Sequence, residues 1–289
     1  MSVLNVVGSI KRPLLPVWNF SIHSLRWIGE VGDALVRGRI ERCTCCGHCG
    51  PMLRHHRAIP SKLVAMWGLS IREANALVRK ETLVCVFCGA KLRARRLAQV
   101  VIDSFPVSGD APKSLREWAK RPESHVLSVA VINKINGVHQ AISALPLLRL
   151  SDFDETDSCP SEDLTRLSYP DESFDLILTS ETLEHVPDLH GAINEIHRVL
   201  KPGGLHIFTI PLLTKTPKTF ARREIRPDSS IVDLAPPISH PGGDWGYPVF
   251  TEFGADIVQL IDQEGFATAI HFGPTTEDDL AQVYVSRKC

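Results

Sequence analysis

The sequence of 289 residues lacks long hydrophobic runs and a large net charge. No apolar stretch approaches the roughly 20 residues that cross a bilayer, and the longest, such as Leu205–Ile210, have the length of a strand. Near the N-terminus the charges follow the apolar patch, an order that argues against a secretory signal and predicts a cytoplasmic protein. With a net charge of -1, 44% hydrophobic and 22% charged residues, the composition indicates a globular chain with a core.

The near-zero net charge conceals two chemically different halves. Residues 1–125 contain 20 Lys and Arg against 9 Asp and Glu, whereas the remaining residues contain 12 against 24. Together with the motifs below, this asymmetry predicts an N-terminal leader over 1–40, a cysteine-rich module with a helical insertion over 41–122, and an α/β domain over 123–289. The basic and acidic parts are expected to dock on each other or to bind a polyanion.

Six of the eight cysteines fall into two tight groups. Each group contains a CxxCG turn, in which two thiolates converge and the glycine frees backbone N–H groups to point at the sulfurs. Two such turns supply four sulfurs for a tetrahedral structural zinc with no open position. The register of the first turn leaves Cys45, His48 and Cys49 as alternatives. The favoured ligands are Cys43, Cys46, Cys85 and Cys88.

Between and after these turns the apolar spacing predicts two helices. One covers 71–81 with Ser70 as its N-cap. The second covers 91–98 and presents basic side chains, which suggests a nucleic-acid surface, a solvated face or a dock for the acidic half. The basic residues are Lys91, Arg93, Arg95 and Arg96.

From His125 onward strands and helices alternate, which predicts an α/β fold with a doubly wound, mainly parallel sheet. A helix over 137–145 separates the first two strands, and another helix runs from Leu189 to the stop signal at 201–204. The expected strands are 126–132, 146–152, 174–179 and 205–210.

The run Leu167–Asp188, continued by the segment 195–204, closely resembles the class I S-adenosylmethionine-dependent methyltransferases of the type 11 kind. The resemblance covers about residues 125–275 and implies a Rossmann-like fold with S-adenosylmethionine as cofactor. The two CxxCG turns also resemble a zinc-ribbon-like leader found before such domains in bacterial proteins.

The resemblance also implies roles for individual residues. An acid at the end of the second strand accepts from the ribose hydroxyls, and Asp152 matches it, with Asp154 as the alternative. Asp163 would accept from the adenine amino group, and Leu164 would pack on the ring. Ser180 would face the methionine moiety. For the acids, the competing interpretation is an ordinary surface carboxylate.

The loop after the first strand departs from the family pattern. It should be rich in glycine so that the backbone can approach the cofactor, yet 128–137 contains only Gly137. Ala130 is small enough to help and Asn133 can hydrogen-bond, whereas Val131 and Ile132 would crowd the turn. Either the loop follows a different path or cofactor binding is weak or lost.

The candidate catalytic bases are His185, at a family position near the methyl group, and His240, in a loop rich in glycine and aromatic residues. A basic run over 216–226 could bind a phosphorylated or acidic substrate. The favoured function is methyl transfer to a small molecule or glycan intermediate. The alternatives are a zinc-ribbon RNA methyltransferase and a cofactor-free pseudo-enzyme that acts as a binding module. The acceptor and the oligomeric state stay open.

Overall fold

The computed structural model describes residues 40–54, 64–65, 67–153, 159–211, 216–240, 246–275 and 280–289. Of the predicted leader over 1–40, only Ile40 is among them, and Asp154 lies outside the described residues. The statements below concern the described part of the chain.

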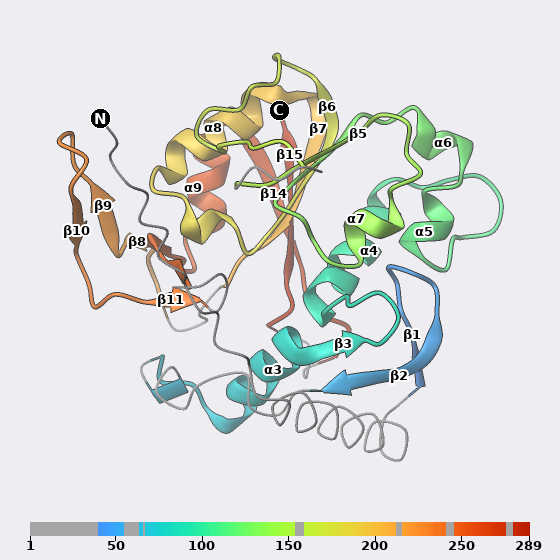
Figure 1. Ribbon diagram of the computed structural model, residues 1–289, viewed down its shortest axis with the longest axis horizontal. Helices are drawn as coiled ribbons and strands as arrows, with labels where there is room; N and C mark the ends of the chain where they lie inside the picture. The colour runs from blue at the N-terminus through green and yellow to red at the C-terminus, as the bar shows by residue number, and fades with distance from the viewer. Residues whose placement is uncertain are drawn as a thin grey trace, which may run out of the picture.

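A six-stranded sheet forms the centre of the molecule, with the order β14-β15-β7-β6-β4-β5 (Figure 1). The strands β5, β4, β6 and β7 run parallel, and β15 and β14 add an antiparallel edge. The predicted doubly wound, mainly parallel fold is therefore confirmed. The bounds are β4 Val129–Ile132, β5 Leu148–Ser151, β6 Phe174–Ser180, β7 Leu200–Thr209, β14 Phe266–His271 and β15 Val283–Lys288.

Two groups of helices cover the two faces of this sheet (Figure 1). On one face, α8 (Leu189–Val199) packs on β7 and α9 (Ile257–Gln263) packs on β14, and both bury side chains such as Ile196 and Ile257 in one core cluster. On the other face, α4 (Leu92–Ser104) packs on β7 and β15 beside α5 (Leu115–Trp118) and α7 (Val138–Ala141). We call these the α8 face and the α4 face.

The N-terminal segment supplies α4 and other buried parts of the α4 face. The strands β1 (Ile40–Arg42), β2 (Cys49–Arg54) and β3 (Leu83–Cys85) form a small antiparallel sheet that carries the cysteine turns. One continuous cluster of buried side chains joins this sheet, α4 and the central strands. The predicted boundary at residues 122 and 123 therefore does not divide the core.

The predicted helix over 71–81 is confirmed as α3 (Ile71–Thr82). Ser70 and Glu73 form a capping box, each side chain bonding the other's backbone N–H, which fixes where the helix begins. The helix predicted over 91–98 is also present, as the longer α4.

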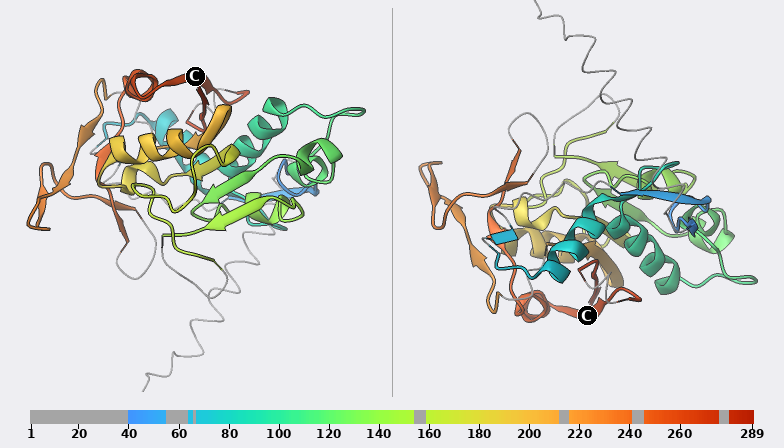
Figure 2. Two further views of the ribbon diagram at one scale, coloured as in Figure 1. Left: turned by 90° about the horizontal axis from the view of Figure 1, so that it is seen from above. Right: turned by 90° about the horizontal axis from the view of Figure 1, so that it is seen from below.

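The connections around the central sheet are short or irregular. Between β5 and β6 the described residues form two isolated bridges, a parallel one from Asp152 to Ser161 and an antiparallel one from Asp163 to Arg166. Figure 2 shows the small strands β8 to β10 extending away from the sheet. The remaining elements are α6 Pro122–His125, η1 Leu183–His185, β8 Phe220–Ala221, β9 Arg223–Ile225, β10 Ile231–Asp233, β11 Ser239–His240, β12 Tyr247–Pro248 and β13 Thr251–Glu252.

Candidate functional site

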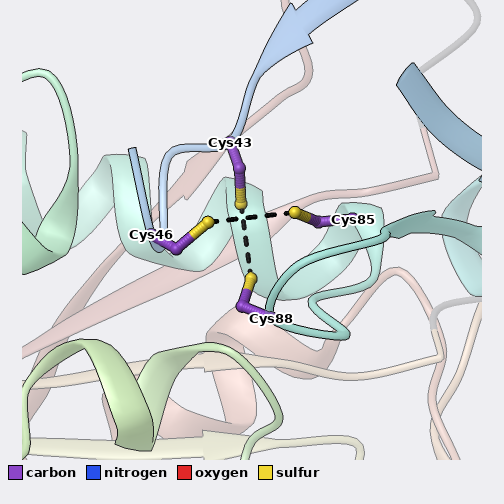
Figure 3. A group of neighbouring side chains, drawn as sticks. All are labelled: Cys43, Cys46, Cys85 and Cys88. Carbon is purple, nitrogen blue, oxygen red and sulfur yellow. Dashed lines mark hydrogen bonds between the residues drawn. The ribbon is translucent and has the colours of Figure 1, made fainter. Parts of the chain in front are cut away.

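The two CxxCG turns bring four sulfurs together beside α4 (Figure 3). The Cys43 and Cys88 sulfurs lie 3.6 Å apart, and those of Cys46 and Cys85 lie 3.8 Å apart. A tetrahedral zinc with bonds of about 2.3 Å separates its sulfur ligands by about 3.8 Å. The cluster therefore has the dimensions of a closed four-thiolate zinc site.

The alternative ligands from the first turn lie elsewhere. The Cys45 thiol is fully buried and donates to the Ala94 carbonyl oxygen at 3.5 Å. Cys49 is exposed, and the His48 ring lies on Phe87. Of the predicted candidates, the structure brings together Cys43, Cys46, Cys85 and Cys88.

The cysteine turns also pack against the start of the central fold. Gly137 has a φ of +85°, and a Cβ at this position would lie 2.4 Å from the Cβ of Ala90, which follows the second turn. Gly137, the only glycine of the loop 128–137, thus permits a close contact with the cysteine module. A glycine in the family's cofactor loop instead lets the backbone approach the cofactor.

Three polar residues lie at the carboxyl ends of adjacent parallel strands, the edge where such folds bind ligands. Asn133 follows β4, Asp152 follows β5, and Ser180 ends β6. Asn133 takes a left-handed φ of +63° and donates its N–H to the Ser151 carbonyl at 3.0 Å. Its buried Oδ1 has no hydrogen-bond partner among the described residues. An asparagine therefore makes the turn that a glycine makes in the family pattern.

The other predicted cofactor residues differ in burial. Ala130 in β4 is 1% exposed and Leu164 is 4% exposed, and both belong to the core cluster of the α8 face. Asp163 is exposed, and its Oδ1 accepts from both the N–H and the hydroxyl of Thr165 at 2.8 Å.

Charged residues from the cysteine module reach the carboxyl end of β6. The Lys80 side chain is 2% exposed, and its Nζ lies 3.0 Å from Glu181 Oε1 and 3.4 Å from the Ile210 carbonyl oxygen. Arg93 bonds Glu81 and donates through Nε to Ser180 Oγ at 3.3 Å. Sequence reasoning missed this network, because its partners are far apart in the chain.

Electrostatics favour the charged forms in this network. Burial acts to raise the pKa of Glu81, but the positive charges of Arg93, Lys80 and Lys91 outweigh it and lower the pKa to about 2. Burial likewise opposes the charge of Arg93, yet the carboxylates of Glu81 and others raise its pKa. The two side chains form an ion pair between α3 and α4, and Arg93 also reaches the end of β6 through Ser180.

The expectation of a basic surface on α4 is wrong for two of its arginines. Arg95 is 5% exposed and bonds Glu41 at 2.9 Å, and Arg93 is tied to Glu81 and Ser180. Arg93 also reaches the acidic half, where it donates to Ser180, although its carboxylate partner Glu81 belongs to the basic half. Carboxylate partners turn these side chains inward, because an unpaired charge there would lose its hydration.

The basic run over 216–226 is likewise paired within its own region. Arg222 is buried and bonds Glu252 and the Pro236 carbonyl oxygen. Arg223 bonds Asp233 at 2.5 Å, and Arg226 lies 3.5 Å from Glu224. These partners compete with any acidic substrate.

Both predicted catalytic histidines meet at Glu184. The Nε2 of His185 and the Nδ1 of His240 each lie 3.5 Å from Glu184 Oε1, and the two rings stand edge to face with centroids 5.0 Å apart. The short helix η1 carries Glu184 and His185, and the β11–β12 ladder carries His240. The Phe250 N–H donates to the Glu184 carbonyl at 2.7 Å and ties the two segments together. Sequence reasoning missed Glu184, although its neighbour His185 marks the position.

Among the described residues, no helix is long and apolar enough to cross a membrane.

Comparisons with known proteins agree with this fold. Residues 124–208 match the family model described as a methyltransferase domain. The observed sheet thus defines a Rossmann-like α/β fold. More specifically, the segment that contains β4, β5, β6 and most of β7 is similar to the methyltransferase domain family.

The relatives resemble only part of this chain. Cycloartenol-C-24-methyltransferase of Arabidopsis thaliana is 37% identical over 89 residues, which are 31% of this chain and 25% of that enzyme. Demethylmenaquinone methyltransferase of Geobacillus stearothermophilus is 40% identical over 60 residues, 21% of this chain and 24% of that enzyme. The chain thus matches about a quarter of the length of either relative.

Among solved structures, an S-adenosylmethionine-dependent methyltransferase of Mesorhizobium loti covers 60% of this chain and 98% of its own, with 19% identity and a TM-score of 0.39. A putative methyltransferase in complex with the Trm112 activator, from Haloferax volcanii, covers 59% of this chain and 85% of its own, with 16% identity and a TM-score of 0.37.

Proposed function

We propose that the protein is an S-adenosylmethionine-dependent methyltransferase that methylates a small molecule or glycan intermediate in the cytoplasm. The observation that carries this proposal is the row of polar residues at the carboxyl ends of β5, β4 and β6, within the segment that matches the methyltransferase domain. The reducing cytoplasm suits a chain whose eight cysteines are all free.

The residues at these strand ends fit the cofactor. The Oδ1 of Asn133 is a buried acceptor that lacks a donor, and the cofactor's ammonium or hydroxyl groups would supply one. Asp152 would accept from the ribose hydroxyls, and Asp163 would accept from the adenine amino group. Ser180, held by Thr209 Oγ1 at 2.8 Å and by Arg93, would border the methionine moiety. S-adenosylmethionine supplies an electrophilic methyl group, and the protein supplies position and desolvation.

The residues around Glu184 would serve the methyl acceptor. A hydroxyl acceptor must lose its proton, and imidazole titrates near neutrality. The His185 Nδ1 lies 2.7 Å from the Pro248 carbonyl oxygen, so this nitrogen holds the proton as donor and Nε2 is the basic atom. His240 stands beside it as the second candidate base.

The cysteine cluster would hold a structural zinc. Its four thiolates fill a tetrahedral shell and leave no position for a substrate. The zinc would fix the two turns that support α4 and the docking contact at Gly137. Zinc is therefore assigned to stability and not to the methyl transfer.

Calorimetric titration with S-adenosylmethionine and with S-adenosylhomocysteine tests the cofactor assignment. We expect binding by the unmodified protein and at least a tenfold weaker affinity for Asp163→Ala, because a charged acceptor is lost. Asp228→Ala is the matched control, because Asp228 makes the same type of turn, with Ser230 bonded at 2.9 and 2.6 Å, in the projecting β9–β10 region. A folded protein that gives no heat with millimolar cofactor contradicts the proposal and leaves the pseudo-enzyme alternative.

The RNA alternative loses its main support in the structure. It rests on a basic surface along α4, and Arg93 and the buried Arg95 are held in ion pairs. Binding to RNA with a steep salt dependence would restore that alternative.

A further inference from the structure

We infer that Glu184, His185 and His240 bind one divalent transition-metal ion, at a site separate from the cysteine cluster. Each residue offers one ligand atom, and these atoms all lie within 4.8 Å of one another. Three features of the cluster lead to this assignment: an uncompensated carboxylate, the orientation of the His185 ring, and the spacing of the ligand atoms.

The Glu184 carboxylate is fully buried and lacks a donor. Its exposed fraction is 0%, and neither Oε1 nor Oε2 has a hydrogen-bond partner among the described residues. Arg93 contributes positive charge at longer range, but its hydrogen bonds go to Glu81 and Ser180. A buried carboxylate without donors is strongly unfavourable unless a cation lies against it.

The His185 ring presents a lone pair to this carboxylate. Its Nδ1 lies 2.7 Å from the Pro248 carbonyl oxygen, which can only accept, so Nδ1 carries the hydrogen. In the neutral ring, Nε2 then directs a lone pair toward Glu184 Oε1 at 3.5 Å. A backbone carbonyl that holds the second ring nitrogen is the usual support of a metal-binding histidine.

The spacing of the ligand atoms fits an ion better than a hydrogen bond. Both imidazole nitrogens lie 3.5 Å from Glu184 Oε1, beyond the usual range of about 2.7 to 3.2 Å for such bonds. Bonds of about 2.0 to 2.1 Å to a tetrahedral ion separate two ligands by about 3.4 Å. Two imidazoles favour zinc, cobalt, nickel or iron over magnesium and calcium.

Three protein ligands leave one position of a tetrahedral ion open. The side chains of His185 and His240 are 21% and 22% exposed, which gives the ion a path from solvent. On the proposed function, and only there, the open position would receive the oxygen of the methyl acceptor. With the ion bound, the histidine lone pairs are occupied, and the ion instead of a histidine would favour loss of the acceptor proton. The binding of the ion itself does not depend on that function.

Cobalt titration of the zinc-loaded protein tests the site without cofactor or acceptor. Protein that holds one zinc at the cysteines is transferred to metal-free buffer and titrated with Co²⁺, with calorimetry and visible absorption as readouts. We expect one additional Co²⁺ per chain with weak d–d bands and no sulfur charge-transfer band, because the new ligands are nitrogen and oxygen. Glu184→Gln and His240→Ala should each weaken this binding at least a hundredfold.

The matched control is His190→Ala, because His190 forms an isolated surface pair with Glu264 at 2.9 Å. It should bind Co²⁺ as the unmodified protein does. If Glu184→Gln fails to fold, His240→Ala alone carries the test, since its ring is partly exposed. The inference is overturned if the unmodified protein takes up no additional Co²⁺, if uptake is accompanied by a sulfur charge-transfer band and release of zinc, or if the folded ligand variants retain full affinity. Failure of S-adenosylmethionine binding would remove the proposed function and leave this result standing.

Discussion

The α8 face and the α4 face of the central sheet are covered by helices that reach it in different ways. The helix α8 is the connection between the neighbouring parallel strands β6 and β7, so the path of the chain holds it on the sheet. The helix α4 precedes every strand of that sheet, and no crossover holds it in place.

The α4 face has other attachments instead. The cysteine cluster closes the turns beside α4. The ion pair of Lys80 with Glu181 and the hydrogen bond from Arg93 to Ser180 fasten the segment to the end of β6. A helix that is not part of a crossover connection can therefore join a Rossmann-like core when a metal-ligand cluster and ion pairs hold it on the sheet. Four predictions test this difference between the two faces, in order from the largest to the smallest expected change.

The largest effect is expected from Cys85→Ser. Loss of one thiolate opens the cluster, and structural zinc sites contribute on the order of 10 kcal/mol to folding at neutral pH. We expect the zinc content to fall from about one per chain to nearly none, with loss of the cooperative thermal transition. Cys289→Ser, at an exposed cysteine, is the control. If the Cys85→Ser protein is stable and keeps its zinc, the cysteine cluster does not hold the α4 face in place.

The next effect is expected from Lys80→Met, which leaves Glu181 buried without its cation. Removing one partner of a buried pair costs about 3 to 5 kcal/mol, measured as the free energy of unfolding in urea. Lys91→Met is the matched control, because Lys91 lies 3.3 Å from Glu81 but is 41% exposed, and exposed pairs contribute less than about 1 kcal/mol. Equal losses for both variants would show that burial does not set the strength of this attachment.

Truncating one buried side chain on each face tests whether the two faces unfold together. Leu97→Ala on α4 and Ile196→Ala on α8 each empty a position that is 0% exposed, and we expect each to lower the unfolding free energy by about 3 kcal/mol. If both faces share one core, each variant should shift a single transition that near- and far-ultraviolet circular dichroism report together. A separate early transition in Leu97→Ala alone would mean that the α4 face unfolds by itself.

The smallest effect is expected from lowering the pH, which destabilises the α8 face through His206. Burial lowers the pKa of His206 to about 3, and its Nε2 lies 2.9 Å from Thr179 Oγ1. Because the folded pKa lies below the unfolded value of about 6.5, the stability is present above pH 6.5 and is lost as the pH falls toward 3. Between pH 7 and pH 5 this histidine alone should cost about 2 kcal/mol, which His206→Gln should abolish in urea titrations at both pH values. The same loss in the variant would assign the acid sensitivity to other groups.

Local patterns predicted much of the fold. Ser70 and Glu73 mark the start of α3, and the alternation of apolar segments predicted the strands β4, β5, β6 and β7 within a few residues. The CxxCG spacing also predicted which sulfurs meet, because a tight turn fixes the distance between its two cysteines. These features depend on neighbours in the chain, and a sequence displays them directly.

Other predictions failed because they depended on distant partners. The α4 arginines look like a basic surface in the sequence, and only the carboxylates of Glu41 and Glu81 turn two of them inward. The sequence gives no reason for the single glycine of the loop 128–137, and the structure shows that Gly137 makes room for Ala90. Neither partner is adjacent in the chain.

The sequence by itself determined the class of the fold, the two CxxCG turns and the segment that matches a methyltransferase domain, since each rests on short-range spacing. The tertiary structure chose Cys43 and Cys46 among the ligands that the first turn offers. Only the tertiary structure decided that Glu184 joins His185 and His240, and that Lys80 and Arg93 of the module reach β6. Folding must close long loops to make such contacts, and the burial that makes them strong exists only once both faces of the sheet are covered.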